Sequence, residues 1–489
     1  MGESEAGLTG SAAALWITLP RVGVRAADRT VALSALVLLL TALNLLWGLG
    51  SSTLFVDEAF SWALSLVPAG DLYDSVDRSE VAPPTFYALL HLWRAVFGDS
   101  EFALRLMSVC AAVPLVGVTA WLSAMLGKRR LAGVLGGLMA ALSPLVLEYG
   151  TQVRAYIFCM LATTLAVAAA TRYLTGGARE RKWLVLSGAA AVGALWLHYT
   201  AIPVIAALAL WLLGDRRVPR KAALGYAATL VVAQLLVTPL MLSQSENAGA
   251  KAFGALTWEN VVRTFGAPLD GRYRVSVVLP LVCVIAFAIA AGWALRRSTG
   301  EHRAVAAIAL ASPLGLLVLT VVSDDALLSR YSAVAAPLIV AVIAAVAARE
   351  RTLLPAVAVV LCLAAGGSIA SHTDKGQYPD LGGAYDLIAG SGSRTAPVVI
   401  APQALPELAS EPLVNYYRRG LPNTATFILN DPGATAALTK AREVWIIGAR
   451  PVPAAAARTF LKRAFKLRLV SSETLPGRDP LQVILAARQ

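Results

Sequence analysis

Two adjacent carboxylates, Asp57 and Glu58, follow the first long hydrophobic run of the chain. A carboxylate at such a place can deprotonate a hydroxyl group or bind a divalent cation. It can equally be a hydrated residue of an ordinary loop. Which of the three holds depends on the elements that position the pair.

Other polar side chains stand where later hydrophobic runs begin or end. These candidates for substrate contacts are Glu148, Gln152, Arg154, Tyr156, His198, Tyr199, Arg330 and Tyr331. The two arginines can bind a phosphate group through paired, charge-assisted hydrogen bonds. Plainer interpretations stay open, because Arg154 can anchor lipid headgroups and Arg330 can pair with Asp324 or Asp325. His198 can likewise cap a helix or fill a core.

A continuous helix through the region of Arg154 would place Arg154 on a different face from the neighbouring candidates. On a continuous helix, Tyr149, Gln152 and Tyr156 share one stripe, and Arg154 lies well off it. Arg154 therefore joins their site only if the helix begins near residue 151.

The composition defines the class of protein that positions these residues. Of the 489 residues, 57% are hydrophobic and 15% charged, and the mean hydropathy is +0.66. Apolar runs that approach the bilayer-spanning length of about 20 residues recur along the chain. This pattern predicts a polytopic α-helical membrane protein and excludes a soluble globular one. The formal charge of +12 does not indicate nucleic-acid binding, because the basic residues form short clusters between the hydrophobic runs.

These runs predict about eleven transmembrane helices. The predicted spans are 31–50, 102–127, 131–147, 155–174, 183–199, 201–214, 222–243, 275–295, 304–322, 332–348 and 353–371. Basic clusters occupy alternate connections, at 21–29, 128–130, 179–182, 216–221, 296–303 and 349–351. The positive-inside rule places these connections and the N-terminus in the cytoplasm of a multi-pass cell-membrane protein.

The connection 51–101 is then external, and it is rich in aspartate and glutamate. Within it, residues 59–66 and 86–93 have apolar side chains at helical spacing. This spacing predicts two amphipathic helices in the headgroup region, which would hold Asp57 near the lipid surface.

The composition changes after the last predicted span. Short β-prone runs at 398–401, 426–429, 444–448 and 483–486 alternate with helix-compatible stretches at 411–419 and 453–465. We therefore predict a cytoplasmic segment 1–30, a membrane domain 31–371 and a small extracytoplasmic α/β domain 372–489. The last domain has no Gly-rich phosphate loop, so we interpret it as a lid or acceptor-side module.

An enzyme working at the outer face has no access to cytoplasmic nucleotide-activated substrates, so its activated donor must be carried by a lipid. If the donor is a polyprenyl-phosphate sugar, the leaving phosphate departs without being protonated. One carboxylate base for an acceptor hydroxyl, with one or two arginines or a metal ion for the phosphate, then suffices.

Several motifs in this order resemble bacterial members of the dolichyl-phosphate-mannose-protein mannosyltransferase family, within the GT-C glycosyltransferase fold. They are Asp57-Glu58-Ala59, Pro83-Pro84-Thr85-Phe86-Tyr87, Phe97-Gly98-Asp99-Ser100-Glu101 with Arg105-Leu106, Gln152 with Arg154 and Tyr156, His198-Tyr199, and Arg330-Tyr331 before Pro337. The resemblance covers about residues 30–350, with a weaker similarity in the tail. It implies inverting transfer from a polyprenyl-phosphate sugar, with the first acidic residue near the acceptor and basic residues on the donor phosphate.

The chain departs from the family pattern at two places. Ala82 stands where the family often has histidine, and Val153 stands where an acidic residue is common nearby, although Glu148 could take that place in space. These differences leave the acceptor and any metal requirement open.

We therefore expect Asp57 to act as general base on the acceptor hydroxyl, and Glu58 to orient this hydroxyl or a metal ion. Arg154 and Arg330 are expected to hold the donor phosphate, and the remaining candidates to contact substrate. The expected sugar is mannose or a related hexose, or a pentose, and the acceptor a glycan, lipid or protein.

Two alternatives stay open. A transporter or flippase of lipid-linked saccharides would carry ionisable residues at mid-membrane in paired halves. Here such residues gather instead at the predicted external ends of the spans. An inactive relative acting only as an assembly partner is the other alternative.

Overall fold

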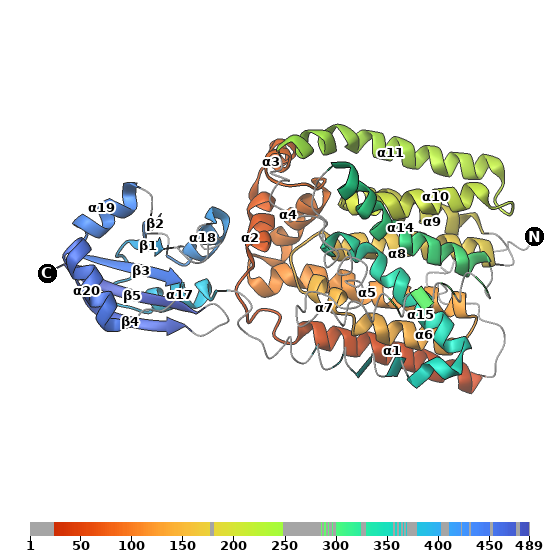
Figure 1. Cartoon of the computed structure of the whole chain (residues 1–489), viewed down its shortest axis with the longest axis horizontal. Helices are drawn as coiled ribbons and strands as arrows, with labels where there is room; N and C mark the ends of the chain where they lie inside the picture. Colours follow the sequence, from red (N-terminus) through yellow and green to blue (C-terminus); the bar gives the residue numbers. More distant parts are fainter. Residues whose placement is uncertain are drawn as a thin grey trace, which may run out of the picture.

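The computed structural model describes residues 24–176, 180–247, 300–323, 329–355, 379–401, 410–421, 423–429, 432–449, 453–475 and 480–488, with single residues of 285–296 and 357–368. Figure 1 shows a helical bundle at one end, a small α/β domain at the other, and a group of short helices between them. Most of the predicted segment 1–30 lies outside the described residues.

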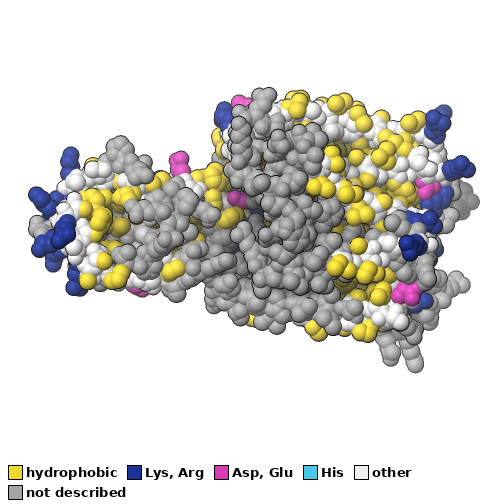
Figure 2. Space-filling view, in the orientation of Figure 1, with side chains coloured by type: hydrophobic (Ala, Val, Ile, Leu, Met, Phe, Trp, Pro, Cys, Tyr) yellow, Lys and Arg dark blue, Asp and Glu magenta, His cyan; other side chains and the backbone are white. Residues whose placement is uncertain are grey.

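The bundle consists of apolar helices joined by short connections (Figure 1). They are α1 (Val24–Leu46), α5 (Glu101–Gly127), α6 (Arg130–Ala141), α7 (Pro144–Gly150), α8 (Tyr156–Thr175), α9 (Arg181–Leu197), α10 (Ile202–Gly214), α11 (Arg220–Asn247), α14 (Gly300–Ser323) and α15 (Ala336–Arg349), with the 3-10 turns η1 (Tyr199–Ala201), η3 (Ser329–Ala335) and η4 (Arg351–Leu353). Nearly all of α15 is buried, whereas leucines such as Leu210 and Leu236 are largely exposed on the bundle surface. Figure 2 shows this apolar covering over the sides of the bundle, which suits a lipid environment.

The predicted spans that fall within the described residues coincide with helices. Five of those helices are long and apolar enough to cross a membrane, namely α5, α8, α11, α14 and the segment Tyr331–Arg349. The predicted span 131–147 is not one helix, because α6 and α7 meet at a 56° bend. Pro144 begins α7, and its ring and missing N–H prevent α6 from continuing. The predicted spans 275–295 and 353–371 lie mostly outside the described residues.

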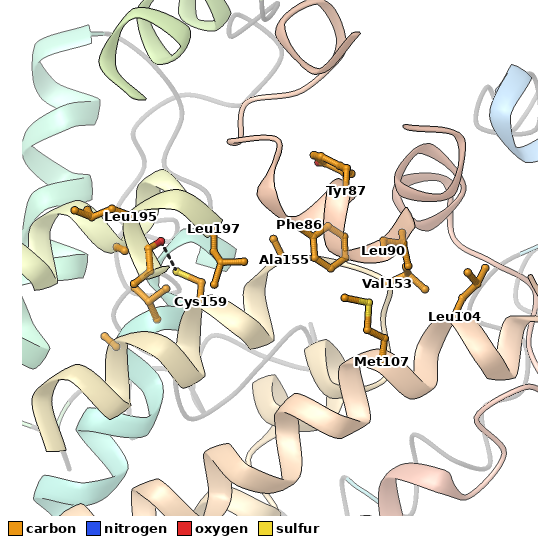
Figure 3. Packing of buried hydrophobic residues seen from close by; sticks show 14 of the residues in the cluster. Phe86, Tyr87, Leu90, Leu104, Met107, Val153, Ala155, Cys159, Leu195 and Leu197 are labelled. Atoms are coloured by element: carbon orange, nitrogen blue, oxygen red, sulfur yellow. Dashed lines mark hydrogen bonds between the residues drawn. The ribbon is translucent and has the colours of Figure 1, made fainter. Parts of the chain in front are cut away.

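Three short helices cap one end of the bundle (Figure 1). α2 (Val56–Leu66) and α4 (Thr85–Phe97) confirm the helices predicted at 59–66 and 86–93. α3 (Leu72–Ser79) was not predicted, because it is short and mostly polar. Phe86, Tyr87 and Leu90 of α4 pack in the core shared with α5 and the connection before α8, as Figure 3 shows.

The C-terminal domain contains a five-stranded sheet of order β2-β1-β3-β5-β4. Its strands are β1 (Val398–Ala401), β2 (Thr426–Ile428), β3 (Glu443–Ala449), β4 (Leu467–Leu475) and β5 (Leu481–Arg488), and its helices are α17 (Leu381–Ala389), α18 (Glu411–Arg418), α19 (Pro432–Lys440) and α20 (Ala454–Phe465). β1 pairs in parallel with β2 and β3, whereas β5 is antiparallel to β3 and β4. The four predicted strands and two predicted helices are confirmed. β4 was missed because it is an edge strand with mostly exposed side chains.

Candidate active site

Asp57 lies in the first turn of α2, where the partial positive charge of a helix N-terminus favours a carboxylate. Its side chain keeps 30% of its surface exposed. The exposed part leaves room for a substrate hydroxyl, as a general base requires. The role of Asp57 as general base stays a prediction.

Glu58, one residue later, is buried and has different partners. It forms a two-pronged ion pair with Arg105 of α5, with Nε–Oε1 and Nη2–Oε2 distances of 3.0 and 2.8 Å. Its oxygens also accept the main-chain N–H groups of Phe55 at 2.8 Å and Val153 at 3.0 Å. Glu58 thereby joins α2, α5 and the connection before α8. This geometry suits a residue that holds the site together rather than the predicted role of orienting a metal ion.

Arg154 lies between two carboxylates. Its Nη1 is 3.0 Å from Oε1 of Glu80, and its Nη2 is 3.9 Å from Oδ2 of Asp57. Nη1 also donates to the main-chain oxygen of Asp57 at 3.3 Å and to Ser61 Oγ at 3.4 Å. The structure thus brings together Asp57 and Arg154, and it adds Glu80.

Glu80 was not among the predicted site residues. Its position in the sequence, just before the paired prolines Pro83-Pro84 of the family-like motif, was the available signal. Several other acidic residues share the same loop, so composition alone could not single it out.

A break in the helix explains how Arg154 reaches this group. α7 ends at Gly150 and α8 begins at Tyr156, and the residues between them are not helical. The stripe expected of a continuous helix therefore does not apply. Burial alone would lower the pKa of Arg154, but the nearby Glu80, Tyr87 and Asp57 raise it above its ordinary value. The guanidinium stays charged.

Tyr87 of α4 is buried in the hydrophobic core (Figure 3), and its phenol lies near enough to Glu80 and Arg154 to be affected by both charges. Burial, followed by the charge of Glu80, raises its pKa well above the ordinary value, although Arg154 acts in the opposite direction. The phenol therefore stays neutral at physiological pH.

Three of the predicted substrate-contact residues, Tyr156, His198 and Tyr331, lie in one row of aromatic rings. Tyr156 at the start of α8 lies 4.8 Å from the ring of His198, and His198 lies 6.2 Å from the ring of Tyr331 in η3. Tyr149 of α7 extends the row, with its ring centre 4.7 Å from that of Tyr156. Residues far apart in the sequence thus meet in one aromatic cluster.

Other predicted contacts occupy different places. The hydroxyl of Tyr199 donates to Gln244 of α11 at 2.9 Å, and the Gln244 amide reaches the carbonyl of Ala82 at 3.1 Å. Gln152 offers its main-chain carbonyl to Ser108 Oγ at 2.5 Å, and Glu148 lies half-buried in α7. The side chain of Arg330 lies outside the described residues.

Within the described part of the chain, no three His, Cys, Asp or Glu side chains gather as a metal site would require. Asp57 and Glu58 do not act as a pair there, because Asp57 faces Arg154 and Glu58 faces Arg105. The residues present therefore do not fit the metal site proposed for this pair.

Comparison with known proteins gives the relationships of the chain. Residues 81–242 match the family model for dolichyl-phosphate-mannose-protein mannosyltransferase. The crystal structure of ArnT from Cupriavidus metallidurans in the apo state is similar, with a TM-score of 0.57 and 15% identity over 94% of this chain and 98% of that one. The structure of ArnT from the same organism bound to undecaprenyl phosphate gives 0.55 and 13% over 95% and 98%. No curated protein sequence matches the chain.

The chain thus has the fold of a polytopic GT-C membrane protein with a small C-terminal sheet region. The family match covers residues 81–242 and agrees with the resemblance that the sequence motifs indicated. Over nearly the whole chain, the similarity to ArnT is one of fold. The matched segment includes α4, together with Arg105, Arg154 and His198, and Glu80 directly precedes it. Asp57 and Glu58 precede it.

Proposed function

We propose that this protein is an integral membrane glycosyltransferase that transfers a sugar from a polyprenyl-phosphate donor to a hydroxyl acceptor at the outer face of the membrane. The observation that carries the proposal is the group formed by the part-exposed Asp57 and the charged Arg154 at one end of an apolar bundle. The family match and the ArnT-like fold support it. The proposed sugar is mannose or a related hexose, or a pentose.

In this proposal Asp57 takes the proton of the acceptor hydroxyl as that oxygen attacks the anomeric carbon. The bond between this carbon and the donor phosphate oxygen breaks, and polyprenyl phosphate leaves with the electron pair. A carboxylate base is sufficient, because the phosphate needs cationic stabilisation and no proton.

Charge balance bears on how the phosphate is held. Arg154 carries one positive charge against the two carboxylates of Asp57 and Glu80, so these three side chains together repel an anion. The contact of Arg154 with Glu80 is close, whereas that with Asp57 is longer than a hydrogen bond, and a phosphate oxygen would displace the looser one. A second cation is still required. We propose Arg330 for it, because the sequence places Arg330 directly before Tyr331 of the aromatic cluster.

The distribution of basic residues supports the proposed orientation. Figure 2 shows lysine and arginine side chains at the end of the bundle that lies away from the C-terminal domain. The ends of α5, α9, α10 and α11 near the basic clusters face that way in Figure 1. With that end in the cytoplasm, Asp57 and the C-terminal domain are external.

The test is direct. Purified protein is incubated with a panel of polyprenyl-phosphate hexoses and pentoses, with glycan, lipid and peptide acceptors, and release of polyprenyl phosphate is measured. We expect release with at least one donor and loss of that release in Asp57→Asn. Donor movement across the bilayer of proteoliposomes without any release would instead support the transporter alternative.

A further inference from the structure

The C-terminal domain contacts the membrane domain through α18, which packs against α2 (Figure 1). The hydroxyl oxygen of Tyr417 accepts the main-chain N–H of Leu54 at 2.6 Å. The hydroxyl of the preceding Tyr416 donates to the carbonyl oxygen of Asp99 at 2.7 Å. Two neighbouring tyrosines of one domain thus bind the main chain of the other.

Arg419 strengthens the same contact. Its guanidinium lies 3.8 Å from the ring centre of Tyr416 and 4.9 Å from that of Trp62 in α2, and 3.6 Å from the Asp99 carboxylate. Burial alone would raise the pKa of Asp99, but its hydrogen bond and ion pair with Arg94, together with the charge of Arg419, lower it. Asp99 therefore stays ionised. Arg419 holds the end of α18 against α2 through its cation–π contact with Trp62, and against the loop between α4 and α5 through its ion pair with Asp99.

The segment held by Tyr417 leads directly into the helix that carries Asp57. Arg105 of the membrane domain donates to the main-chain oxygens of Ser52 at 2.8 Å and Thr53 at 2.9 Å. Tyr417 of the C-terminal domain takes the N–H of the next residue, Leu54. Both domains therefore fix the main chain just before α2.

The ring of Tyr417 packs closely against Gly382. A Cβ atom added at Gly382, just inside α17, would lie 3.1 Å from Cε1 of Tyr417 and 3.7 Å from Cγ2 of Thr53. Burial raises the pKa of Tyr417, so its phenol keeps its proton and its oxygen remains a neutral acceptor for the N–H of Leu54. Since Leu54 is itself buried, no water can replace this acceptor without a rearrangement.

We propose that Tyr417 is a positioning residue for Asp57, so that docking of the C-terminal domain sets the geometry of the base. This inference rests on the proposed function. Asp57 must lie within hydrogen-bond distance of the acceptor hydroxyl, and a displacement of about 1 Å can lower a rate by about 100-fold. In the proposed function Arg154 and Arg330 hold the donor phosphate, so we expect the effect of Tyr417 to fall on turnover and not on donor affinity.

The test compares two Tyr→Phe changes in the same domain. Tyr417→Phe removes the acceptor of the Leu54 N–H. The control is Tyr385→Phe, because Tyr385 is also buried but its hydroxyl lies 3.2 Å from Thr426 Oγ1, within the C-terminal domain. Turnover, donor KM and hydrogen exchange of residues 54–58 are measured on the full chain for both variants.

We expect Tyr417→Phe to lower kcat by roughly tenfold at nearly unchanged donor KM, a fraction of the loss that a 1 Å displacement can cause. Exchange at residues 54–58 should become faster in this variant only. Unchanged exchange overturns the proposal, and so does faster exchange with normal kcat, because Tyr417 would then be structural only. Should the wild-type protein transfer no sugar from any donor, the proposed function and the catalytic part of this inference fail together. Faster exchange in Tyr417→Phe would then show the main-chain contact alone.

Discussion

At the scale of single residues, the adjacent carboxylates Asp57 and Glu58 have separate environments. Asp57 is part-exposed and 3.9 Å from a charged guanidinium, whereas Glu58 is buried in an ion pair with Arg105. A base needs access to its substrate, and a buried ion pair mainly fixes geometry. The distinction makes the two residues separable by mutation.

Asp57→Asn keeps the shape of the side chain and its position in α2 but cannot accept a proton. We expect turnover to fall by about 10² to 10⁴-fold, the usual contribution of a general base. Donor affinity should change little. Asp74→Asn, at an exposed position of α3 in the same loop, is the matched control and should retain full activity. Near-normal turnover of Asp57→Asn at normal expression would assign the base to another carboxylate.

Substitutions of Arg154 can distinguish a residue that binds the donor phosphate from one that only anchors lipid headgroups. If it binds the donor phosphate, Arg154→Ala should lower both donor affinity and turnover, because the interaction strengthens as the leaving group gains charge. Arg154→Lys should restore only part of the loss, since lysine keeps the charge but lacks the planar fork that binds two oxygens. Donor binding, turnover and expression are measured for both variants. If Arg154 is only a headgroup anchor, lysine should replace it fully, and alanine should reduce protein level with specific activity unchanged.

Part of this site could be predicted from residue types and order. Asp57, Arg154, Tyr156, His198 and Tyr331 were predicted, and the structure places them near one end of the bundle. The pairing of Arg154 with Glu80 could not be predicted, because it depends on how α3 and α4 fold back over the bundle. The separate environment of Glu58 likewise depends on Arg105, which the sequence motif contains without indicating its partner.

At the scale of elements, long apolar runs predicted most of the helices, and short β-prone runs predicted most of the strands. The exceptions have local causes. Pro144 divides the span predicted at 131–147. α3 and β4 were not predicted, because α3 is mostly polar and the side chains of β4 are mostly exposed. The segments that meet at the site are the irregular ones, namely the turn before α2 and the residues between α7 and α8. Buried hydrogen bonds must hold such segments, because no helix satisfies their main-chain groups.

Glu58→Gln tests how strongly one such group holds the elements together. The change leaves the Arg105 guanidinium buried without its counter-charge, which typically costs about 3–5 kcal/mol. We expect a markedly lower unfolding temperature in detergent. Glu101→Gln, in the first turn of α5, is the control, because it leaves the pair of Glu58 and Arg105 intact. A fully stable Glu58→Gln protein that has lost only turnover would instead give Glu58 a catalytic role.

At the scale of the whole molecule, the sides of the bundle carry an apolar covering, which we call the apolar belt. The basic end of the bundle lies on one side of this belt, and the C-terminal domain lies on the other (Figure 2). The charged group around Asp57 lies near the C-terminal domain, where α2, α3 and α4 cap the bundle (Figure 1). If the apolar belt lies in the membrane, the two ends must face different compartments. The proposal of a lipid-borne donor depends on Asp57 facing the outer one.

Single cysteines can establish this orientation in a background without the native cysteines. Asp74→Cys in α3, Ser471→Cys in β4 and Arg216→Cys after α10 all replace exposed side chains, so burial does not prevent labelling. In intact spheroplasts, we expect a membrane-impermeant thiol reagent to label positions 74 and 471, and position 216 only after the membrane is permeabilised. The positive-inside rule sets this expectation, because the basic cluster at 216–221 should be cytoplasmic. Labelling at 216 with protection at 74 and 471 would place Asp57 in the cytoplasm, where nucleotide-activated sugars are available, and would remove the reason for a lipid-borne donor.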